Sequence, residues 1–156
     1  MSGTAGDLGF EVRLAEKPED REACFAVRRE VFVEEQGVDE ALEYDVHDEP
    51  GAETLHLLAV GPEGPLGTGR LLRAAGAEEG VGALGRLAVL RSARGRGVGA
   101  ALVRAVEEAA RGRGFVVVDL HAQVSAVEFY ERLGYVAYGG EFLDAGIVHR
   151  AMRKAL

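Results

Sequence analysis

Apolar and polar residues follow two different periods along this chain. In residues 10–15, FEVRLA, every second side chain is apolar, which is typical of a strand with one buried face. Residues 115–120, FVVVDL, form an almost continuous apolar run, which is typical of a central strand covered on both faces. In residues 122–133, AQVSAVEFYERL, apolar side chains recur at i, i+3, i+4 and i+7, which predicts an amphipathic helix. The chain is therefore expected to contain both strands and helices.

Turn and capping residues divide the rest of the chain into further elements. Pro18 near the start, acidic residues in the first turn and Gly37 at the end predict a helix over residues 17–37. The tetrapeptide GPEG at 61–64 predicts a hairpin, and Gly134 is expected to end the last helix. Further strands are expected at 54–60, 65–75, 82–90 and, as a pair joined by LDAG, within 135–156. A further helix is expected at 98–111 and an acidic loop at 38–52.

The order of these elements decides the expected fold class. A strand, a helix, two or three strands, a helix, a strand, a helix and two strands predict an α/β fold. Such a fold has one mixed central sheet, here of about six or seven strands, with helices on both faces. A length of 156 residues with 47% hydrophobic residues is enough for one domain with its own core. We expect a single domain at residues 8–156 and a flexible N-terminus at residues 1–7.

Composition narrows the compartment and the classes of partner. The single cysteine, Cys24, excludes an internal disulfide, fits a reducing compartment and is expected to be a buried, unreactive thiol. The sequence shows neither a secretory signal nor an apolar run near the ~20 residues of a membrane span. We therefore expect a cytoplasmic protein without membrane contact. A net charge of -8, with no basic strip interleaved with aromatic residues, argues against nucleic acid as a partner. The four histidines lack metal-ligand spacing, so no metal site is expected.

Charge is distributed unevenly along the chain. Between Arg29 and Arg70 there are eleven acidic residues and neither a lysine nor an arginine. Residues 86–113 reverse this balance, because they contain seven arginines and only Glu107 and Glu108 as acids. The first region suits a cation and the second an anion.

The arginine-rich region contains a glycine loop directly before a predicted helix. The first turn of a helix has unpaired N–H groups and about half a positive charge, which together bind phosphate. Glycines let the backbone turn tightly and approach a ligand, and arginine adds bidentate contacts. We therefore expect a cradle for an anion, suited to a pyrophosphate. Its residues are Arg94, Gly95, Arg96, Gly97, Val98, Gly99 and Ala100.

Two kinds of ligand fit this loop. The lysine of the nucleotide-binding P-loop is absent. Gly95-x-Gly97-x-x-Ala100 matches the degenerate fingerprint of dinucleotide-binding domains, and Asp119 follows about twenty residues on. Four residues separate Leu90 from Gly95, however, whereas that fingerprint leaves its strand almost at once. An NAD-type dinucleotide-binding domain is therefore kept as an alternative.

A second motif gives the loop a family resemblance. Residues 89–99 resemble the [QR]-x-x-G-x-[GA] pyrophosphate loop of the GCN5-related N-acetyltransferases (GNAT). Residues 126–135, AVEFYERLGY, resemble the A-x-x-F-Y-x-x-x-G-[FY] helix of the same family. The stretches RREVFVEEQ and DAGIVH are similar to those of the ElaA-like branch, and the likeness covers nearly the whole chain from Phe10 onward. The resemblance implies the GNAT fold and an acetyl-CoA-dependent N-acetyltransferase, while a non-catalytic acyl-CoA-binding module would keep the same loop.

The resemblance also implies roles for individual residues. Backbone groups of Leu87, Ala88 and Val89 would pair with the pantetheine arm of acetyl-CoA, and amides of residues 94–100 would hold its pyrophosphate. Ser125 and Phe129 would flank the arm on the far side. Tyr130 matches the tyrosine that protonates the departing thiolate. A phenol with a pKa near ~10 can donate a proton to a thiolate whose pKa is near ~8.5. The acetyl group would pass directly to the acceptor in a ternary complex.

The acceptor side is less well defined by the sequence. An amine must lose a proton before or during attack, so a general base is expected. The possible bases are Glu34, Glu35, Asp45, His56, His121 and His149, of which His121 is weakly preferred because it follows the central strand. The acidic segment 34–53, with Glu34, Glu35 and Gln36 as substrate-side candidates, favours a cationic small-molecule amine. A homodimer through the two closing strands is plausible for this fold.

Overall fold

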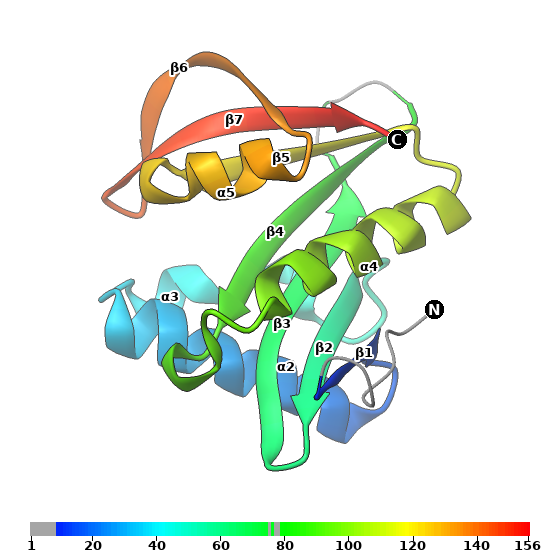
Figure 1. Cartoon of the computed structure of the whole chain (residues 1–156), viewed down its shortest axis with the longest axis vertical. Coiled ribbons are helices and arrows are strands. Elements are labelled where there is room, and N and C mark those ends of the chain that lie inside the picture. Colours follow the sequence, from blue (N-terminus) through cyan, green and yellow to red (C-terminus); the bar gives the residue numbers. More distant parts are fainter. Residues whose placement is uncertain (1–8, 75, 77–78) are drawn as a thin grey trace.

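A computed structural model describes residues 9–74, 76 and 79–156 and shows one seven-stranded sheet (Figure 1). The strand order is β1-β2-β3-β4-β5-β7-β6, and only the β4–β5 pair is parallel. The strands are β1 Glu11–Leu14, β2 Leu55–Gly61, β3 Gly64–Arg73, β4 Val81–Val89, β5 Val117–Gln123, β6 Val136–Asp144 and β7 Ile147–Ala155. The predicted α/β fold with one mixed sheet is confirmed. The expected flexible stretch 1–7 and the first residue of the expected domain 8–156 lie outside the described residues.

The helices occur near their predicted places. They are α2 Pro18–Arg28, the π-helix η1 Arg29–Glu35, α3 Glu40–Glu43, α4 Val98–Gly112 and α5 Val127–Arg132, with 3₁₀ turns at Val46–Asp48, Arg91–Ala93 and Val124–Ala126. Pro18 occupies the first turn of α2 together with Glu19 and Asp20, which suits the positive end of a helix. Gly134 has φ +98° after α5, and the following N–H donates to the Tyr130 carbonyl at 3.1 Å, as expected of a helix end.

Three predicted boundaries are wrong. Residues 38–52 are not simply a loop, because they contain α3 and a 3₁₀ turn capped by the Asp45 side chain. Residues 122–123 belong to β5 rather than to the following helix, since Gln123 pairs with His149 of β7. Residues 115–116 precede β5. In each case a tertiary contact or a local cap overrides the periodicity of the sequence.

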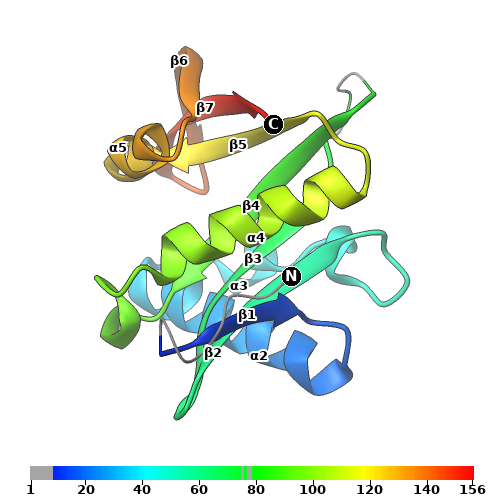
Figure 2. The same cartoon turned by 45° about the vertical axis from the view of Figure 1, so that its right-hand side comes forward.

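Helices cover both faces of the sheet, as Figures 1 and 2 show. On β2, Leu57 packs in the cluster that contains Leu102 of α4, whereas its neighbour Leu58 packs with Cys24 of α2. This alternation follows from the period of two in a strand. Cys24 is fully buried, as expected, and this burial raises the pKa of its thiol to about 11.

Candidate functional site

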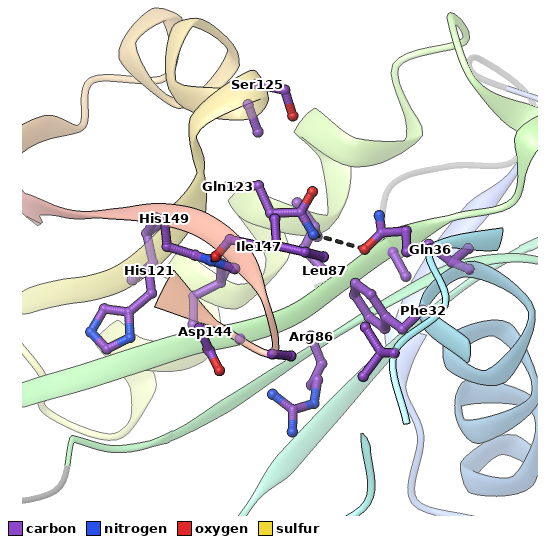
Figure 3. Close-up of a pocket in the computed structure, with 18 of the residues that line it drawn as sticks. Phe32, Gln36, Arg86, Leu87, His121, Gln123, Ser125, Asp144, Ile147 and His149 are labelled. Carbon is purple, nitrogen blue, oxygen red and sulfur yellow. Dashed lines mark hydrogen bonds between the residues drawn. The ribbon is translucent and has the colours of Figure 1, made fainter. Parts of the chain in front are cut away.

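A cavity of about 710 Å³ opens where β4 and β5 separate. The two parallel strands pair only from Val81↔Val117 to Leu84↔Leu120, although both strands continue beyond this point. The remaining walls come from η1, the residues before and within α3, the α4 loop, α5 and the β6–β7 hairpin. Figure 3 shows Ser125 at one end of the cavity and Arg86 at the other.

An irregularity in β4 lies where the strands part. Between the pairs Thr68↔Ala88 and Arg70↔Gly85, two residues of β4 oppose one residue of β3. This is a β-bulge, and Arg86 within it has φ +52°, a conformation that costs a non-glycine residue energy. The Arg86 guanidinium donates to the carbonyl of Glu43 at 3.0 and 3.2 Å, which holds the bulge against α3. A β-bulge bends its strand. The bulge lies on β4, at the point where β4 and β5 stop pairing.

The glycine loop has an open helix N-terminus. Gly95 and Gly97 have φ +79° and +81°, and Gly97 is the N-cap of α4, without a side-chain cap. The Ala101 N–H donates to the carbonyl of the N-cap residue Gly97 at 3.1 Å. The N–H groups of residues 98–100 are therefore available to an anion. A β-carbon on Gly99 would lie 3.2 Å from the Phe129 ring, so a glycine there lets α4 and α5 approach closely.

Arg94 and Glu35, predicted on opposite sides of the reaction, form an ion pair. The two guanidinium nitrogens of Arg94 donate to the two carboxylate oxygens of Glu35 at 2.8 and 2.7 Å, and Arg94 Nε donates to the Val89 carbonyl at 3.0 Å. Arg91 lies 3.3 Å from the same carboxylate. The hydrogen bond from Arg94 contributes most to lowering the pKa of Glu35. The guanidinium of Arg94, which was expected to bind phosphate, is therefore already paired with Glu35.

Tyr130 lines the cavity from α5 and is only 7% exposed. Its ring makes edge contacts with Phe129 and Tyr135, with centroid distances of 5.0 and 5.9 Å. Burial raises the pKa of the phenol well above its usual value. The hydroxyl therefore carries its proton at neutral pH, which a general acid requires.

Of the six candidate bases, two line the cavity and four do not. His121 lines it with an exposed side chain, its ring 5.0 Å from that of Phe142. His149 lines it and is 9% exposed, with Nδ1 at 2.7 Å from the Ile147 carbonyl. A carbonyl only accepts hydrogen bonds, so Nδ1 carries the proton and Nε2 has the free lone pair. The candidates that do not line the cavity are Glu34, Glu35, Asp45 and His56. Glu35 lies at its edge through the pair with Arg94.

Gln36 and Gln123 bridge two walls of the cavity. The Gln123 side chain on β5 donates to the Gln36 side chain at 2.8 Å, as Figure 3 shows. Of the predicted cofactor residues, Leu87, Ala88, Val89, Arg94, Ser125 and Phe129 line the cavity, whereas Gly95, Arg96, Gly97, Val98, Gly99 and Ala100 lie in the adjoining loop and helix start. The sequence analysis missed Arg86, because nothing in RLAV indicates a bulge.

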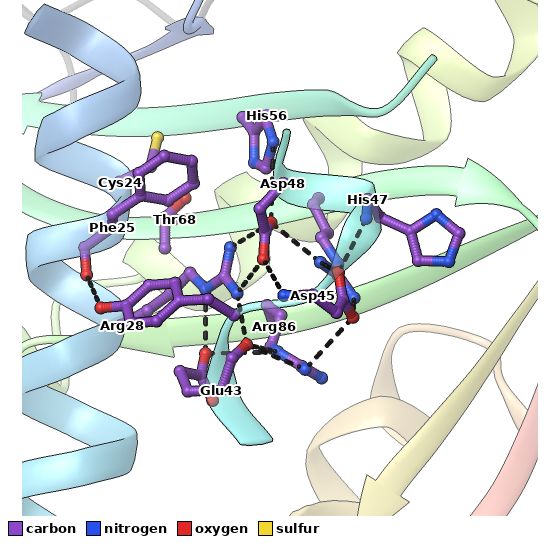
Figure 4. A network of polar contacts seen from close by, with 12 residues as sticks. Cys24, Phe25, Arg28, Glu43, Asp45, His47, Asp48, His56, Thr68 and Arg86 are labelled. Atoms are coloured by element: carbon purple, nitrogen blue, oxygen red, sulfur yellow. Dashed lines mark hydrogen bonds and ion pairs between the residues drawn. The ribbon is translucent and has the colours of Figure 1, made fainter. Parts of the chain in front are cut away.

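A polar network supports the wall formed by residues 38–52 (Figure 4). Glu43 and Asp48 are 3% and 8% exposed, and both bind the buried guanidinium of Arg28 at 2.9 and 2.7 Å. Arg70 binds Asp45 at 2.8 Å and Asp48 at 2.9 Å. Three carboxylates of the acidic segment 34–53, those of Glu43, Asp45 and Asp48, are therefore already paired with arginines of the same chain.

Comparison with known proteins assigns the family. The profile of the acetyltransferase (GNAT) domain matches residues 15–156. The uncharacterized N-acetyltransferase YjcF of Bacillus subtilis is 41% identical over 142 residues, which cover 90% of this chain and 96% of that protein. The chain belongs to the GNAT acetyltransferase family. It is therefore an N-acetyltransferase, and this membership favours acyl-CoA over a dinucleotide as the ligand of the glycine loop.

Solved structures agree with this assignment. A candidate N-acetyltransferase from Lactobacillus plantarum has a TM-score of 0.85 and 32% identity, covering 95% of this GNAT chain and 99% of its own. ElaA of Escherichia coli shares the fold, with a TM-score of 0.78, 22% identity and 99% of both chains covered. An aminoglycoside 6'-N-acetyltransferase in complex with coenzyme A also shares the fold, at a TM-score of 0.72 and 19% identity, with 92% and 96% of the two chains covered.

Among residues 9–74, 76 and 79–156, no helix is long and apolar enough to cross a membrane. Within the same described part of the chain, no three His, Cys, Asp or Glu side chains are grouped so that they could hold a metal ion.

Proposed function

We propose that this GNAT enzyme transfers an acetyl group from acetyl-CoA to the primary amine of a small molecule, directly and in a ternary complex. The observation that carries this proposal is the opening between β4 and β5, which has an uncapped helix N-terminus beside it and Tyr130 in its wall. These features supply a strand edge, an anion site and a proton donor around one cavity.

The residues of the cavity fit an acyl-CoA. The Leu90 N–H donates to the Leu66 carbonyl of β3 at 2.9 Å, so the backbone groups of Val89 point to the opposite edge, where β5 has parted. This edge, formed by Leu87, Ala88 and Val89, would hold the pantetheine arm, with Ser125 and Phe129 beside it. The amides of residues 94–100 would hold the pyrophosphate. When bound, acetyl-CoA supplies the thioester carbonyl that is attacked.

Two side chains would move protons around that carbonyl. Tyr130 holds a proton in a buried position and would donate it to the departing sulfur. His121 stays a possible base, but His149 is better placed, because the Ile147 carbonyl fixes its tautomer and leaves Nε2 free to accept a proton from the amine.

The predicted cytoplasmic location and homodimer remain proposals. The exposed Val136 and Leu143 on β6 support a dimer through the closing strands.

Thermal unfolding with acetyl-CoA, CoA, dephospho-CoA and NAD tests the cofactor. A ligand at a hundred times its Kd adds about 2.7 kcal/mol, which raises the Tm of a domain of this size by roughly 5–10 °C. We expect this shift with acetyl-CoA and CoA but not with NAD. A shift with NAD alone would refute the proposal.

A tyrosine variant tests the catalytic role. Tyr130→Phe should lower kcat in an amine screen by roughly 10²-fold, the lower end for a general acid, while the Kd for CoA stays unchanged. Tyr44→Phe is a matched control, because the Tyr44 hydroxyl donates to the Phe25 carbonyl at 3.1 Å, outside the cavity. Equal activity of Tyr130→Phe and wild type would show that Tyr130 is only a packing residue.

A further inference from the structure

The end of the cavity at Arg86, opposite Ser125, would receive the acceptor and is called the acceptor end here. It is bounded by apolar side chains from four different segments. Phe32 of η1 and Leu87 of β4 face the same space as Ile147 of β7, as Figure 3 shows. Leu42 of α3 lines it as well, although 60% of that residue is exposed. The polar groups interleaved with them are neutral amides and histidine, from Gln36, Gln123 and His149. Such a surface stabilises the bound state of a ligand with an apolar, uncharged portion, because binding removes apolar area from water.

The charged groups of the cavity are mostly neutralised within the protein. The charged side chains that line it are Glu43, Arg86, Arg94, Asp119 and Asp144. Glu43 lies 3.2 Å from Arg86 and 2.9 Å from Arg28. Arg94 is paired with Glu35 at 2.7 Å, and Asp119 with Arg153 at 2.8 Å. A paired carboxylate gives up an existing interaction before it can bind a ligand ammonium group.

Asp144 is the exception. In the part of the chain that the structure describes, it lines the cavity without an ion-pair partner. It ends β6, and the residues after it, Ala145 and Gly146, have φ +52° and +78°, which form the hairpin turn that leads to Ile147 and His149. The acceptor end therefore has one unpaired negative charge, and that charge lies close in sequence to the better-placed base.

We propose that the acceptor is a primary monoamine with an apolar, uncharged body, such as an arylalkylamine or alkylamine, rather than a polyamine or an amino sugar. The inference rests on the proposed function and names the substrate class of the same site. A single ammonium group matches the single unpaired carboxylate, and the apolar walls receive the remainder of the molecule. Each additional ammonium group would lose water without gaining a partner. This narrows the cationic acceptor expected from the acidic segment 34–53 to one with a single ammonium group, because Glu43, Asp45 and Asp48 of that segment are paired with arginines.

A panel of acceptors tests the proposal. The release of CoA thiol from acetyl-CoA is followed with phenethylamine, hexylamine, spermidine and kanamycin as probes. We expect kcat/KM for the two monoamines to exceed that for spermidine and kanamycin by at least roughly tenfold. Equal or faster turnover of spermidine or kanamycin would overturn the inference.

Two variants test whether the apolar wall of the cavity sets this preference. Leu42→Glu adds a carboxylate to the apolar wall, and it should raise the ratio of spermidine to phenethylamine turnover by roughly threefold to tenfold. Val116→Glu adds the same charge at a residue that is 62% exposed before β5 and does not line the cavity, so the ratio should not change. A change of equal size in both variants would show that net charge, not the cavity wall, sets the preference.

The outcomes for the acceptor and for the cofactor are separable. Binding of acetyl-CoA without turnover of either monoamine overturns the inference and leaves the acyl-CoA site standing. Absence of any thermal shift with acetyl-CoA and CoA overturns the proposed function itself.

Discussion

His56 is a buried histidine that should make the free energy of unfolding depend on pH. It is 3% exposed on β2, its ring meets Phe25 edge-on at 5.5 Å, and its Nε2 is 4.0 Å from the Asp48 carboxylate. Within the described residues, neither ring nitrogen has a hydrogen-bond partner. Burial lowers the pKa of His56 to about 4, and this effect exceeds the opposing attraction of Asp48. The imidazole is therefore neutral in the folded protein at neutral pH.

The sign and size of the effect follow from proton linkage. Above pH ~6.5 the imidazole is neutral in both states, so it adds no pH dependence. As the pH falls from ~6.5 towards ~4, the imidazole is protonated in the unfolded chain but stays neutral in the folded protein, so the free energy of unfolding decreases. With a folded pKa of about 4 and an unfolded pKa of 6.5, the loss at pH ~5 is about 2 kcal/mol.

Urea denaturation at pH 8 and pH 5 measures this loss. Between the two pH values, wild type should lose about 2 kcal/mol more free energy of unfolding than His56→Leu. His47→Gln removes a half-buried histidine nearby, in the 3₁₀ turn Val46–Asp48, and should keep the pH dependence of wild type. The reasoning is refuted if His56→Leu and wild type lose the same free energy over this range.

Two further substitutions test the glycine loop and the sheet. Glu35→Gln frees Arg94 from its bidentate partner and should tighten CoA binding by about twofold to tenfold in calorimetry, whereas weaker binding would show that Glu35 assists the cofactor. Gly82→Ala should lower the free energy of unfolding by about 1–3 kcal/mol, because its β-carbon would lie 2.7 Å from the Phe115 ring. A β-carbon at Gly140 meets nothing within 4 Å, so Gly140→Ala should change the free energy of unfolding by no more than about 0.5 kcal/mol. Equal effects of the two substitutions would contradict this account.

Much of the fold follows from local signals in the sequence. The alternation in residues 10–15 and the periodicity in residues 126–133 correspond to β1 and to the segment that contains α5. The glycines at 95 and 97 adopt the positive φ that their spacing indicates, and Tyr130 lines the cavity as its motif implies. These features depend on neighbours within about one helical turn or on a two-residue period, so a single segment carries the information.

The errors occur where distant residues meet. Arg28, Arg70 and Arg86 neutralise carboxylates of the segment 38–52, and pairs such as Arg86 and Glu43 are more than forty residues apart in the chain. The sequence does not distinguish a carboxylate that is free to bind a ligand from one that is paired with an arginine, because the pairing depends on which strands lie side by side. The pairing of Glu35 with Arg94 is of the same kind.

The sequence by itself determined the elements, their order, the glycine loop before α4 and the family resemblance, since each of these resides in contiguous residues. The tertiary structure decided where β4 leaves β5, which histidine has a fixed tautomer at the cavity, and how much charge is left for an acceptor. Those properties depend on the β-bulge at Arg86 and on ion pairs between segments, and both exist only once the sheet has formed.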